Sequence, residues 1–457
     1  MTTFYVEQFG CRATQADGAA IERQLREQGC AAAGCAADAD FVVLNTCTVT
    51  AAADAQARDA IRKIHAANPA TRIIVTGCYA QRVPEEVAAL PGVTHVVGNS
   101  HKPQIPGLLQ SISAAPLISE REDPAPYHLA AILSGDIFAL SDVLVAPVLG
   151  GEGNHTRPTL KIQDGCNSRC SFCVIPFVRG RSRSLPVATV LSEIQRLANS
   201  GFREIVLSGI NLGTYGRDLT PRVEFLELLR RILGETGVER LRISSVEPLD
   251  VTQDLIELFA ASDRIAPHFH MPLQSASNRV LAAMHRWYRA EHYARRVELI
   301  RERLAHAAIG ADVITGFPGE TEEEHGATVR FIEGRPFTYL HVFSYSQRPG
   351  TRAAALTGHL PGEVIKRRAR ELRALGESKA ATFRESQIGR TLRVLTLYRG
   401  RNDDPSQTPA LSGNYLSVMI PEALPHNQWR DVLVQQCEGK TLLAAPVDIL
   451  VHAGGMV

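Results

Sequence analysis

The chain has 457 residues, of which 45% are hydrophobic, enough for the cores of about two to four domains. Its 49 lysines and arginines balance 48 aspartates and glutamates, so overall charge does not mark a nucleic-acid-binding protein, and any RNA contacts must come from local patches. No apolar run is long enough to cross a bilayer and the amino terminus lacks a signal-peptide pattern, so we expect a cytoplasmic protein without a membrane partner.

Residues 1–114 alternate short β-branched runs with helical stretches. The runs are TFYVEQF, FVVLNT, RIIVTG and THVVG. This alternation predicts a small doubly wound α/β domain. Residues 115–157 are rich in Pro, Gly and Ala without sustained periodicity, so we expect a linker or insertion there. The apolar stretch ILSGDIFALSDVLVAPV within it could instead form an extra strand pair.

Three of the nine cysteines end strand-like runs of this first domain. Cys11, Cys47 and Cys78, together the dispersed triplet, each follow a short apolar run and precede a predicted helix. The carboxyl ends of neighbouring parallel strands meet at one edge of a sheet, so these thiols can converge there. The alternative is three ordinary buried thiols, because free cysteine is among the residues most often buried.

A second set of cysteines lies in the single segment TLKIQDGCNSRCSFCVIP. Cys166, Cys170 and Cys173, the loop triplet, have the spacing C-x3-C-x2-C. Three thiolates on a four-iron cluster leave one iron open to chelate the amino and carboxylate groups of a substrate or cosubstrate. A closed zinc site would need four Cys or His ligands, and no other Cys or His lies within ten residues on either side. The spacing therefore favours an open iron–sulfur cluster.

Residues 158–384 repeat strand, loop and helix about six times, which predicts a partial (β/α)6 barrel. The strand-like runs are TLKIQ, EIVLSG, RLRISSV, HFHMPL, ADVITG and YLHVFSYS. Barrel sites lie at the carboxyl ends of the strands, so the residues just after each run are candidates for ligand binding. His268 and His270 alternate on one strand and could line the barrel interior, although ordinary core histidines show the same pattern.

Residues 385–452 contain the strand-like runs TLRVLTLY, YLSVMIP, WRDVLVQQ and TLLAAPVDIL. These runs predict a small β-barrel. Such barrels bind nucleic acid by charge and base stacking, but the basic content here is modest, so a packing-only module is the alternative.

The segment QDGCNSRCSFCVIPFVRGRSRS is similar to the methylthiotransferase branch of the radical S-adenosylmethionine (SAM) superfamily. That branch has the pattern G-C-N-x-x-C-x-[FY]-C-x-x-P followed by an arginine–glycine pair, which is Arg179 and Gly180 here. The resemblance implies a catalytic 4Fe-4S cluster on the loop triplet, where bound SAM is cleaved reductively to a 5'-deoxyadenosyl radical. It also implies an auxiliary 4Fe-4S cluster on the dispersed triplet, and an RNA-gripping TRAM-like domain that contains Asn414-Tyr415-Leu416.

The same resemblance implies roles for residues at the barrel strand ends and after the cysteine loop. The expected SAM contacts are Gly209, Asn211, Glu247, Gln274 and Gly316, although glycines also occur at strand ends for turn geometry. The expected RNA-binding residues are Arg179, Arg181 and Arg183. Two positions depart from the family pattern: Ala276 replaces the glycine of Q-S-G-S, and Thr14 replaces an asparagine, which puts contacts around the auxiliary cluster in doubt.

The implied reaction adds a methylthio group to C2 of N6-threonylcarbamoyladenosine at position 37 of tRNA, using two SAM molecules. The strings LKIQDGCN, TGCYAQ, RISSVEP and HVFSYSQRPGT favour this branch. The expected partners are the tRNA anticodon loop, whose unpaired bases are accessible, and a reductant protein such as flavodoxin or ferredoxin, but not DNA.

Other functions stay open at this point. Within the family, the substrate could be isopentenyladenosine-37 of tRNA or an aspartate of a ribosomal protein. Outside it, the chain could be a two-cluster electron carrier or an RNA-binding sensor, which would have closed clusters and would bind no SAM.

Overall fold

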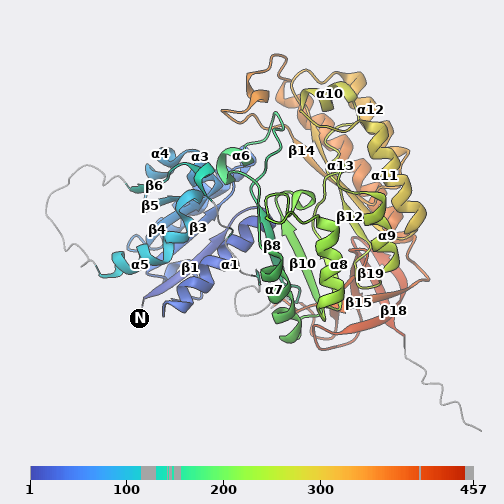
Figure 1. The fold of residues 1–457 in the computed structure, drawn as a ribbon, viewed down its shortest axis with the longest axis horizontal. Coiled ribbons are helices and arrows are strands. Elements are labelled where there is room, and N and C mark those ends of the chain that lie inside the picture. Colours follow the sequence, from blue (N-terminus) through green and yellow to red (C-terminus); the bar gives the residue numbers. More distant parts are fainter. Residues whose placement is uncertain are drawn as a thin grey trace, which may run out of the picture.

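The computed structural model describes residues 2–114, 130–140, 143, 147–148, 156–400 and 403–447. These residues form an amino-terminal α/β sheet, a central open barrel and a small carboxyl-terminal barrel (Figure 1). This layout confirms the multi-domain fold predicted from the sequence. Within the described ranges, every helix is too short or too polar to span a bilayer.

Six strands in the order β2-β1-β3-β4-β5-β6 form the amino-terminal sheet, and every neighbouring pair is parallel. The four predicted strands of this domain correspond to β1, β3, β4 and β5. The strands are β1 (Thr3–Gln8), β2 (Ala31–Ala32), β3 (Phe41–Thr46), β4 (Arg72–Gly77), β5 (Val93–Gly98) and β6 (Ala131–Leu133).

Helices cover both faces of this sheet, as a doubly wound domain requires. On one face α1 and α5 contribute Leu25 and Leu109 to the core, and on the other α2 and α3 contribute Ile61 and Tyr79. Thr50 caps the start of α2 by accepting a hydrogen bond from the backbone of Ala53. The helices are α1 (Arg12–Glu27), η1 (Ala36–Asp38), α2 (Ala51–Ala67), α3 (Cys78–Arg82), α4 (Pro84–Ala88), η2 (Asn99–Gln104) and α5 (Ile105–Ala114).

The segment 115–157, expected to be a linker or insertion, is described only in part. Strand β6 joins the edge of the amino-terminal sheet beside β5, and η3 (Ile137–Ala139) follows it. Strand β7 (Pro147–Val148) pairs antiparallel with β8 of the central region. The apolar stretch thus provides one strand to each of two sheets, and residues 115–129, 141–142, 144–146 and 149–155 lie outside the described residues.

Six parallel strands form the open central barrel, in agreement with the predicted partial (β/α)6 barrel. One sheet has the order β11-β10-β8-β7 and another β12-β13-β14, and a parallel bridge between Leu241 and Ile265 connects them. The parallel strands are β8 (Thr159–Asp164), β10 (Glu204–Gly209), β11 (Arg240–Ile243), β12 (His268–His270), β13 (Ala308–Thr315) and β14 (Tyr339–Ser344), and β9 (Arg183–Ser184) pairs antiparallel with β8.

Amphipathic helices surround the barrel because their apolar faces pack onto its strands. Side chains fix several helix starts: Thr321 and Glu324 form a capping box at α12, and Ser277 caps α10. The helices are α6 (Ile175–Arg179), α7 (Val187–Asn199), η5 (Leu212–Thr214), α8 (Phe225–Glu235), α9 (Gln253–Ala261), α10 (Asn278–Ala283), α11 (Ala290–Arg303), α12 (Glu322–Glu333), η6 (Arg352–Ala355) and α13 (Gly362–Glu385).

The carboxyl-terminal strands close into a small barrel in the order β15-β16-β17-β19-β18. The prediction found four of these strands and missed β16, whose run TPALS contains a proline and is short. The strands are β15 (Thr391–Thr396), β16 (Thr408–Ser412), β17 (Ser417–Ile420), β18 (Trp429–Glu438) and β19 (Thr441–Pro446).

The turn between β16 and β17 joins this small barrel to the central one. Arg242 of β11 donates hydrogen bonds to the carbonyls of Ser412 and Gly413, at 3.1 and 3.0 Å. The ring of Tyr415 lies 4.6 Å from that of His268, measured between centroids. This turn contains Asn414-Tyr415-Leu416, the element that resembles part of a TRAM domain. It therefore contacts the amino-terminal end of the central barrel.

Candidate active site

The loop triplet follows β8 at the carboxyl end of the barrel, where the turn requires a glycine. Gly165 has φ +69°, and a Cβ atom there would lie 1.9 Å from the carbonyl oxygen of Arg181. The next residue, Cys166, donates its backbone N–H to the carbonyl of Gly180 at 3.1 Å. All three cysteines of the loop are free and partly buried. The loop thus presents three unpaired sulfurs toward the barrel mouth.

Burial controls the protonation of these thiols. It raises the pKa of Cys173 to about 12, and it also raises the pKa of Cys170, against the opposing charge of Arg286. Arg286 donates a hydrogen bond to Cys170 Sγ at 3.4 Å and is itself held by Glu247 at 3.1 Å. Buried thiols of this kind lose their protons readily to a metal, so the donor set fits an iron–sulfur cluster.

The fold brings the dispersed triplet together at one edge of the amino-terminal sheet. Cys47 and Cys78 are buried, whereas Cys11 is exposed. Burial, together with the nearby sulfurs of Cys78 and Cys11, raises the pKa of Cys47 to about 12. A Cβ atom on Gly10, which has φ +117°, would lie 2.5 Å from Cys47 Cβ, so only glycine allows this approach. The three sulfurs are therefore neighbours and fit a second cluster.

Polar side chains surround the dispersed triplet. Asn99 donates one hydrogen bond to Cys78 Sγ at 3.6 Å and another to the carbonyl of Val178 in α6 at 2.7 Å. The Thr14 hydroxyl lies 3.6 Å from Cys11 Sγ. The substitution of threonine at this position therefore keeps a polar contact to the cysteine.

A cavity of about 200 Å³ is lined by Cys173 of the loop triplet and reaches the segment that follows Cys47 of the dispersed triplet. Barrel strand ends form most of its wall, and the residues just after Cys47 form another part. Most lining side chains are apolar, which excludes water, while Gln274 and Asp312 are polar. The lining residues are Val49, Thr50, Phe172, Cys173, Val174, Ile175, Gln274, Asp312, Ile314, Phe343, Ser344, Tyr345 and Ser346.

Gln274 has an unusual conformation in this cavity. Its φ of 62° lies in the left-handed region, which is rare for a residue other than glycine. Its side-chain oxygen is buried and has no hydrogen-bond partner. Strained backbone and an unpartnered acceptor mark a position kept for contact with a ligand.

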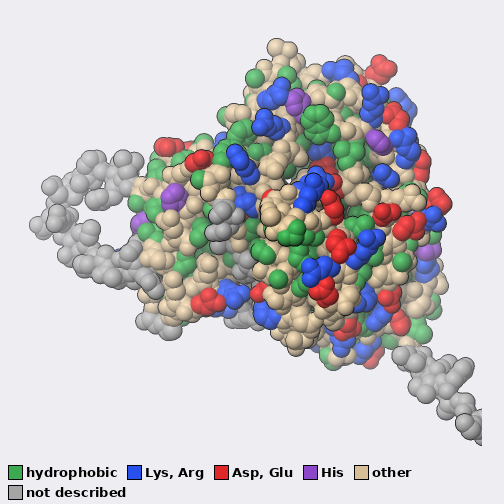
Figure 2. All heavy atoms as spheres, viewed as in Figure 1, with side chains coloured by type: hydrophobic (Ala, Val, Ile, Leu, Met, Phe, Trp, Pro, Cys, Tyr) green, Lys and Arg blue, Asp and Glu red, His purple; other side chains and the backbone are tan. Residues whose placement is uncertain are grey.

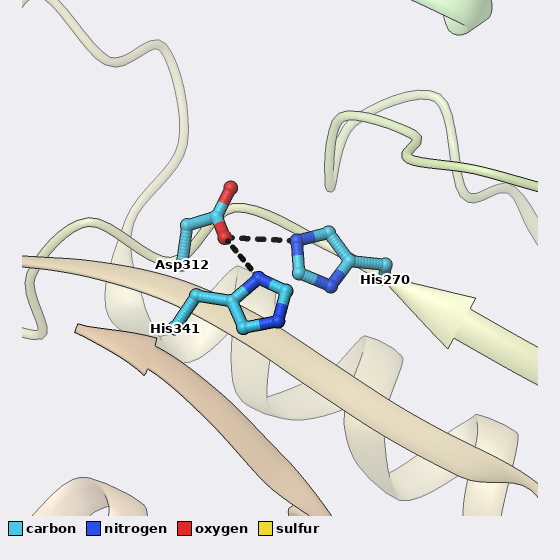
Figure 3. Close-up of side chains that lie close together, drawn as sticks. All are labelled: His270, Asp312 and His341. Atoms are coloured by element: carbon cyan, nitrogen blue, oxygen red, sulfur yellow. Dashed lines mark hydrogen bonds and ion pairs between the residues drawn. The ribbon is translucent and has the colours of Figure 1, made fainter. Parts of the chain in front are cut away.

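His270, Asp312 and His341 converge beneath the cavity, on strands β12, β13 and β14 (Figure 3). Asp312 Oδ1 lies 2.9 Å from His270 Nε2 and 3.2 Å from His341 Nδ1. Burial alone would raise the pKa of Asp312, but the hydrogen bonds from both imidazoles outweigh it and hold that pKa well below its ordinary value. This cluster, named the polar floor, keeps an ionised carboxylate at the base of the cavity.

The polar floor continues into the barrel. The Tyr339 hydroxyl lies 2.9 Å from His270 Nδ1 and 2.7 Å from His268 Nε2. Both histidines therefore line the interior with side-chain partners. The ligand atoms of His270, Asp312 and His341 could group around a metal ion, but the imidazole hydrogen bonds already satisfy the carboxylate without one.

A smaller cavity of about 140 Å³ lies on the other side of the loop triplet and contains Cys170, Asn211, Glu247 and Arg286. The Asn211 side-chain oxygen is buried there without a hydrogen-bond partner. This cavity places two of the expected SAM contacts beside a cysteine of the loop.

The remaining expected SAM contacts lie farther from the two cavities. Gly209 packs closely at the end of β10, where a Cβ atom would lie 2.8 Å from Leu212. Gly316 has φ +77° and donates its N–H to Glu320 at 2.7 Å. Neither glycine lines the two cavities described, so their positions show turn geometry and close packing.

The sequence predicted that Arg179, Arg181 and Arg183 all bind RNA, but two of the three side chains are buried, so this prediction is corrected for those two. Arg179 and Arg183 are 2% and 7% exposed, so neither side chain reaches the surface to meet phosphate. Arg179 bonds to Asp164 at 2.9 Å, and Arg183 donates to the carbonyl of Arg179 at 2.9 Å. Arg181 is exposed. The arginine repeat in the sequence did not show that two of its side chains turn inward.

The sequence patterns also missed Asp312 and Arg286. Asp312 is an acidic residue inside the buried run ADVITG, and a carboxylate in such a run is a signal that could have identified it. Arg286 follows α10 far from the cysteine loop in sequence, and only the fold brings it to Cys170.

Comparisons with known proteins agree with this geometry. Residues 3–98 match a family described as Uncharacterized protein family UPF0004, and residues 160–332 match the Radical SAM superfamily. In solved structures, the chain is similar to a radical S-adenosylmethionine methyltransferase, TsrM, from Kitasatospora setae, with TM-score 0.54 and 16% identity over 77% of this chain and 75% of that one. That similarity supports the fold.

Curated relatives cover nearly the whole chain. A protein of Aquifex aeolicus named threonylcarbamoyladenosine tRNA methylthiotransferase MtaB is 37% identical over 90% of this chain and 95% of its own. The protein of the same name from Bacillus subtilis is 37% identical over 92% and 90%. A tRNA-2-methylthio-N(6)-dimethylallyladenosine synthase of an Arthrobacter species is 35% identical over 90% and 76%. The chain therefore belongs to the radical SAM methylthiotransferase family and is an enzyme of that class.

Proposed function

We propose that this enzyme modifies tRNA by adding a methylthio group to C2 of N6-threonylcarbamoyladenosine at position 37. The names of the relatives from Aquifex aeolicus and Bacillus subtilis support a tRNA substrate of this kind. The observation that carries the proposal is the cavity lined by Cys173 of the loop triplet and by Val49 and Thr50, which follow Cys47, because a base held there would lie beside both cysteine segments.

Membership in the radical SAM family implies one 4Fe-4S cluster and SAM, and the loop triplet has the donors to hold that cluster. When bound, they supply a carbon-centred radical able to act on a C–H bond that side-chain acids and bases cannot activate. Asn211, Glu247 and Gln274 are the candidate SAM contacts whose polar groups lie in the two cavities. We keep Gly209 and Gly316 as candidate backbone contacts.

A second 4Fe-4S cluster on the dispersed triplet is part of the proposal. The convergence of Cys11, Cys47 and Cys78 supports it, as do the burial of two of these thiols and the contacts from Asn99 and Thr14. Cysteines gathered at strand ends for packing alone would not need an amide donor directed at one sulfur.

The protein's own groups would position the substrate and exclude water. Arg286 ties Glu247 to the cysteine loop, which fixes the wall of the smaller cavity. The apolar lining of the larger cavity, with Phe172 and Ile314 among its members, keeps water from a reactive intermediate. Gln274 offers an acceptor and Asp312 an ionised carboxylate toward a bound nucleoside.

The polar floor favours the threonylcarbamoyl substrate over the dimethylallyl one. A threonylcarbamoyl group carries hydroxyl, N–H and carboxylate groups that can pair with Gln274 and His341, whereas a dimethylallyl group is a hydrocarbon. The Gln274 oxygen is buried and has no partner, so an apolar analogue would leave it without a hydrogen bond, which weakens binding of that analogue. The dimethylallyladenosine reaction is the second candidate, because relatives with that name are 33–35% identical to this chain.

The surface around the site suits an unpaired nucleic-acid loop. Phe177 is 57% exposed and Trp287 is 80% exposed, and both are close in sequence to residues that line the cavities. Exposed aromatic rings stack on unpaired bases. The visible face of the molecule has basic and acidic side chains intermixed (Figure 2), so we expect anticodon-loop recognition to depend on local contacts. A reductant protein such as flavodoxin or ferredoxin would supply the electrons.

Mass spectrometry of tRNA nucleosides from a strain that lacks this gene tests the proposed function. We expect loss of 2-methylthio-N6-threonylcarbamoyladenosine and its return on complementation. Loss of the dimethylallyl analogue instead would establish the second candidate. Unchanged tRNA nucleosides would refute both.

A further inference from the structure

Five charged side chains are buried together where the amino-terminal sheet meets the central barrel. Each is at most 7% exposed. Two come from the amino-terminal region, on α1 and η2, and three come from β8 and α6 of the central region. The members of this cluster, named the buried charge network, are Asp17, Lys102, Lys161, Asp164 and Arg179.

Direct ion pairs connect all five. Asp17 accepts from Lys102 at 2.9 Å, from Arg179 at 3.0 Å and also from Lys161. Asp164 pairs with Lys161 at 2.8 Å and with Arg179 at 2.9 Å. Three cations share two carboxylates, so one positive charge is left over. Burying a surplus positive charge costs free energy unless an anion lies nearby.

No described carboxylate outside the network pairs with its three cations. Arg183 lines the same small cavity but has partners of its own. Within the described part of the chain, Arg179 Nε is buried and has no hydrogen-bond acceptor. The network therefore has both a surplus charge and an unused donor on Arg179.

The dispersed triplet is the acidic group next to this surplus. Asn99 lines the same small cavity as Arg179 and donates a hydrogen bond to Cys78 Sγ at 3.6 Å. Thr14 lies 3.4 Å from Arg179 Nη2 and 3.6 Å from Cys11 Sγ, and so contacts both. The charge network and the three sulfurs are parts of one site.

We propose that Arg179, supported by Lys102, is a positioning residue of the auxiliary cluster, balancing its charge and donating Nε–H to one of its sulfurs. The inference rests on the proposed second cluster. A four-iron cluster with three thiolate ligands has a net charge of about −1, which matches the charge left over in the network. Arg179 is the last residue of α6, shortly after Cys173. The central region therefore completes the site in the amino-terminal region.

This charge balance predicts opposite effects for two substitutions. Arg179→Gln removes the compensating charge and the donor, so reduction of the cluster becomes harder and its potential falls. Asp17→Asn removes a negative charge from the same network, so the potential rises. A role in holding the domains together would instead make both variants bind the cluster less well, without opposite shifts.

The test uses the full chain with Cys166, Cys170 and Cys173 changed to alanine, so that only the auxiliary cluster is measured. We would determine iron content, the midpoint potential by EPR-monitored titration, and the rate of iron loss to a chelator. We expect Arg179→Gln to lower the potential and release iron about tenfold faster or more, as the loss of a charged hydrogen bond predicts. Arg179→Lys keeps the charge, so its midpoint potential should stay close to that of the parent triple variant.

Arg368→Gln is the matched control, because Arg368 is also buried and paired with a carboxylate, Glu320, at 2.8 Å, apart from the cysteines. It should destabilise the fold and leave the potential unchanged. Full iron with equal potentials in Arg179→Gln and Asp17→Asn, or shifts of the same sign, would overturn the inference. If either variant fails to fold, Lys102→Met should lower the potential, and an unchanged value would refute it. Absence of iron from the parent triple variant would instead refute the second cluster.

Discussion

The two cysteine triplets are built in different ways. The loop triplet lies within residues 166–173, where one strand, one glycine turn and one short loop set the geometry. The dispersed triplet requires three strand ends, and its surroundings include an arginine from another region of the chain. The first site is nearly local, whereas the second exists only when the sheet is complete and the central barrel is in contact with it.

This difference explains what each site can do. The loop sets the spacing of its three ligands within one short segment, while Arg286 and Met284 from elsewhere in the barrel bond to Cys170 and Ser171. A site assembled from distant segments responds to changes in any of them, and so connects the chemistry at the cluster to the docking of two domains. The cavity is lined by residues of the cysteine loop and by Val49 and Thr50, which follow Cys47, so a substrate there would contact both segments.

Removing one ligand from each triplet should separate their roles most strongly. Cys166→Ala should keep only the auxiliary cluster, about four of about eight iron atoms, and abolish SAM cleavage. Cys47→Ala should keep the other cluster and still form 5'-deoxyadenosine, but transfer no sulfur. Iron analysis and product chromatography measure both outcomes. If Cys166→Ala has the same iron content as the unmutated protein, or if Cys47→Ala methylthiolates normally, the assignment is contradicted.

Glycines before the cysteines offer a second comparison. Gly165→Ala places a Cβ atom 1.9 Å from a backbone oxygen in the loop, and Gly77→Ala places one 2.3 Å from the Thr46 oxygen, both at positive φ. Each change adds about 1–3 kcal/mol of backbone strain, and more from the clash. We expect Gly165→Ala to lose the loop cluster selectively and Gly77→Ala the auxiliary one. Gly201→Ala is the control, because its φ is +89° but no atom lies within 4 Å. Equal loss of both clusters in each variant would show that the two sites fold as one unit.

The sequence predicted the local site better than the assembled one. Spacing alone indicated the loop cysteines, and apolar runs predicted fourteen of the described strands. The burial of Arg179 and Arg183 was not predicted, because a repeated arginine looks the same whether it faces phosphate or a buried carboxylate. Asp312 and Arg286 were missed for a similar reason: their partners are far away in sequence, and no periodic pattern records such pairs.

His341 tests the polar floor, because it bonds to Asp312, which lines the larger cavity. The side chain is 56% exposed beside Asp312, so it can reach a polar substituent of the nucleoside. His341→Phe removes that partner, and we expect methylthiolation of threonylcarbamoyladenosine tRNA to fall about tenfold, while SAM cleavage persists. Binding assays with tRNA that carries or lacks the threonylcarbamoyl group provide the control, since the variant should bind both forms alike. If His341→Phe still prefers the modified tRNA, the polar floor does not read this group.

Substitution of Arg181 should give the smallest effect. It distinguishes an exposed arginine from the buried Arg179 nearby. The Arg181 side chain is exposed, while Arg179 is buried among the charges beside the dispersed triplet. A surface arginine that meets phosphate contributes about one unit to the salt dependence of binding, so Arg181→Ala should weaken tRNA binding and lower that slope by about one. Arg222→Ala, another exposed arginine, is the control and should leave the slope unchanged. An unchanged slope for Arg181→Ala would mean that its side chain carries only a solvated charge and does not meet phosphate.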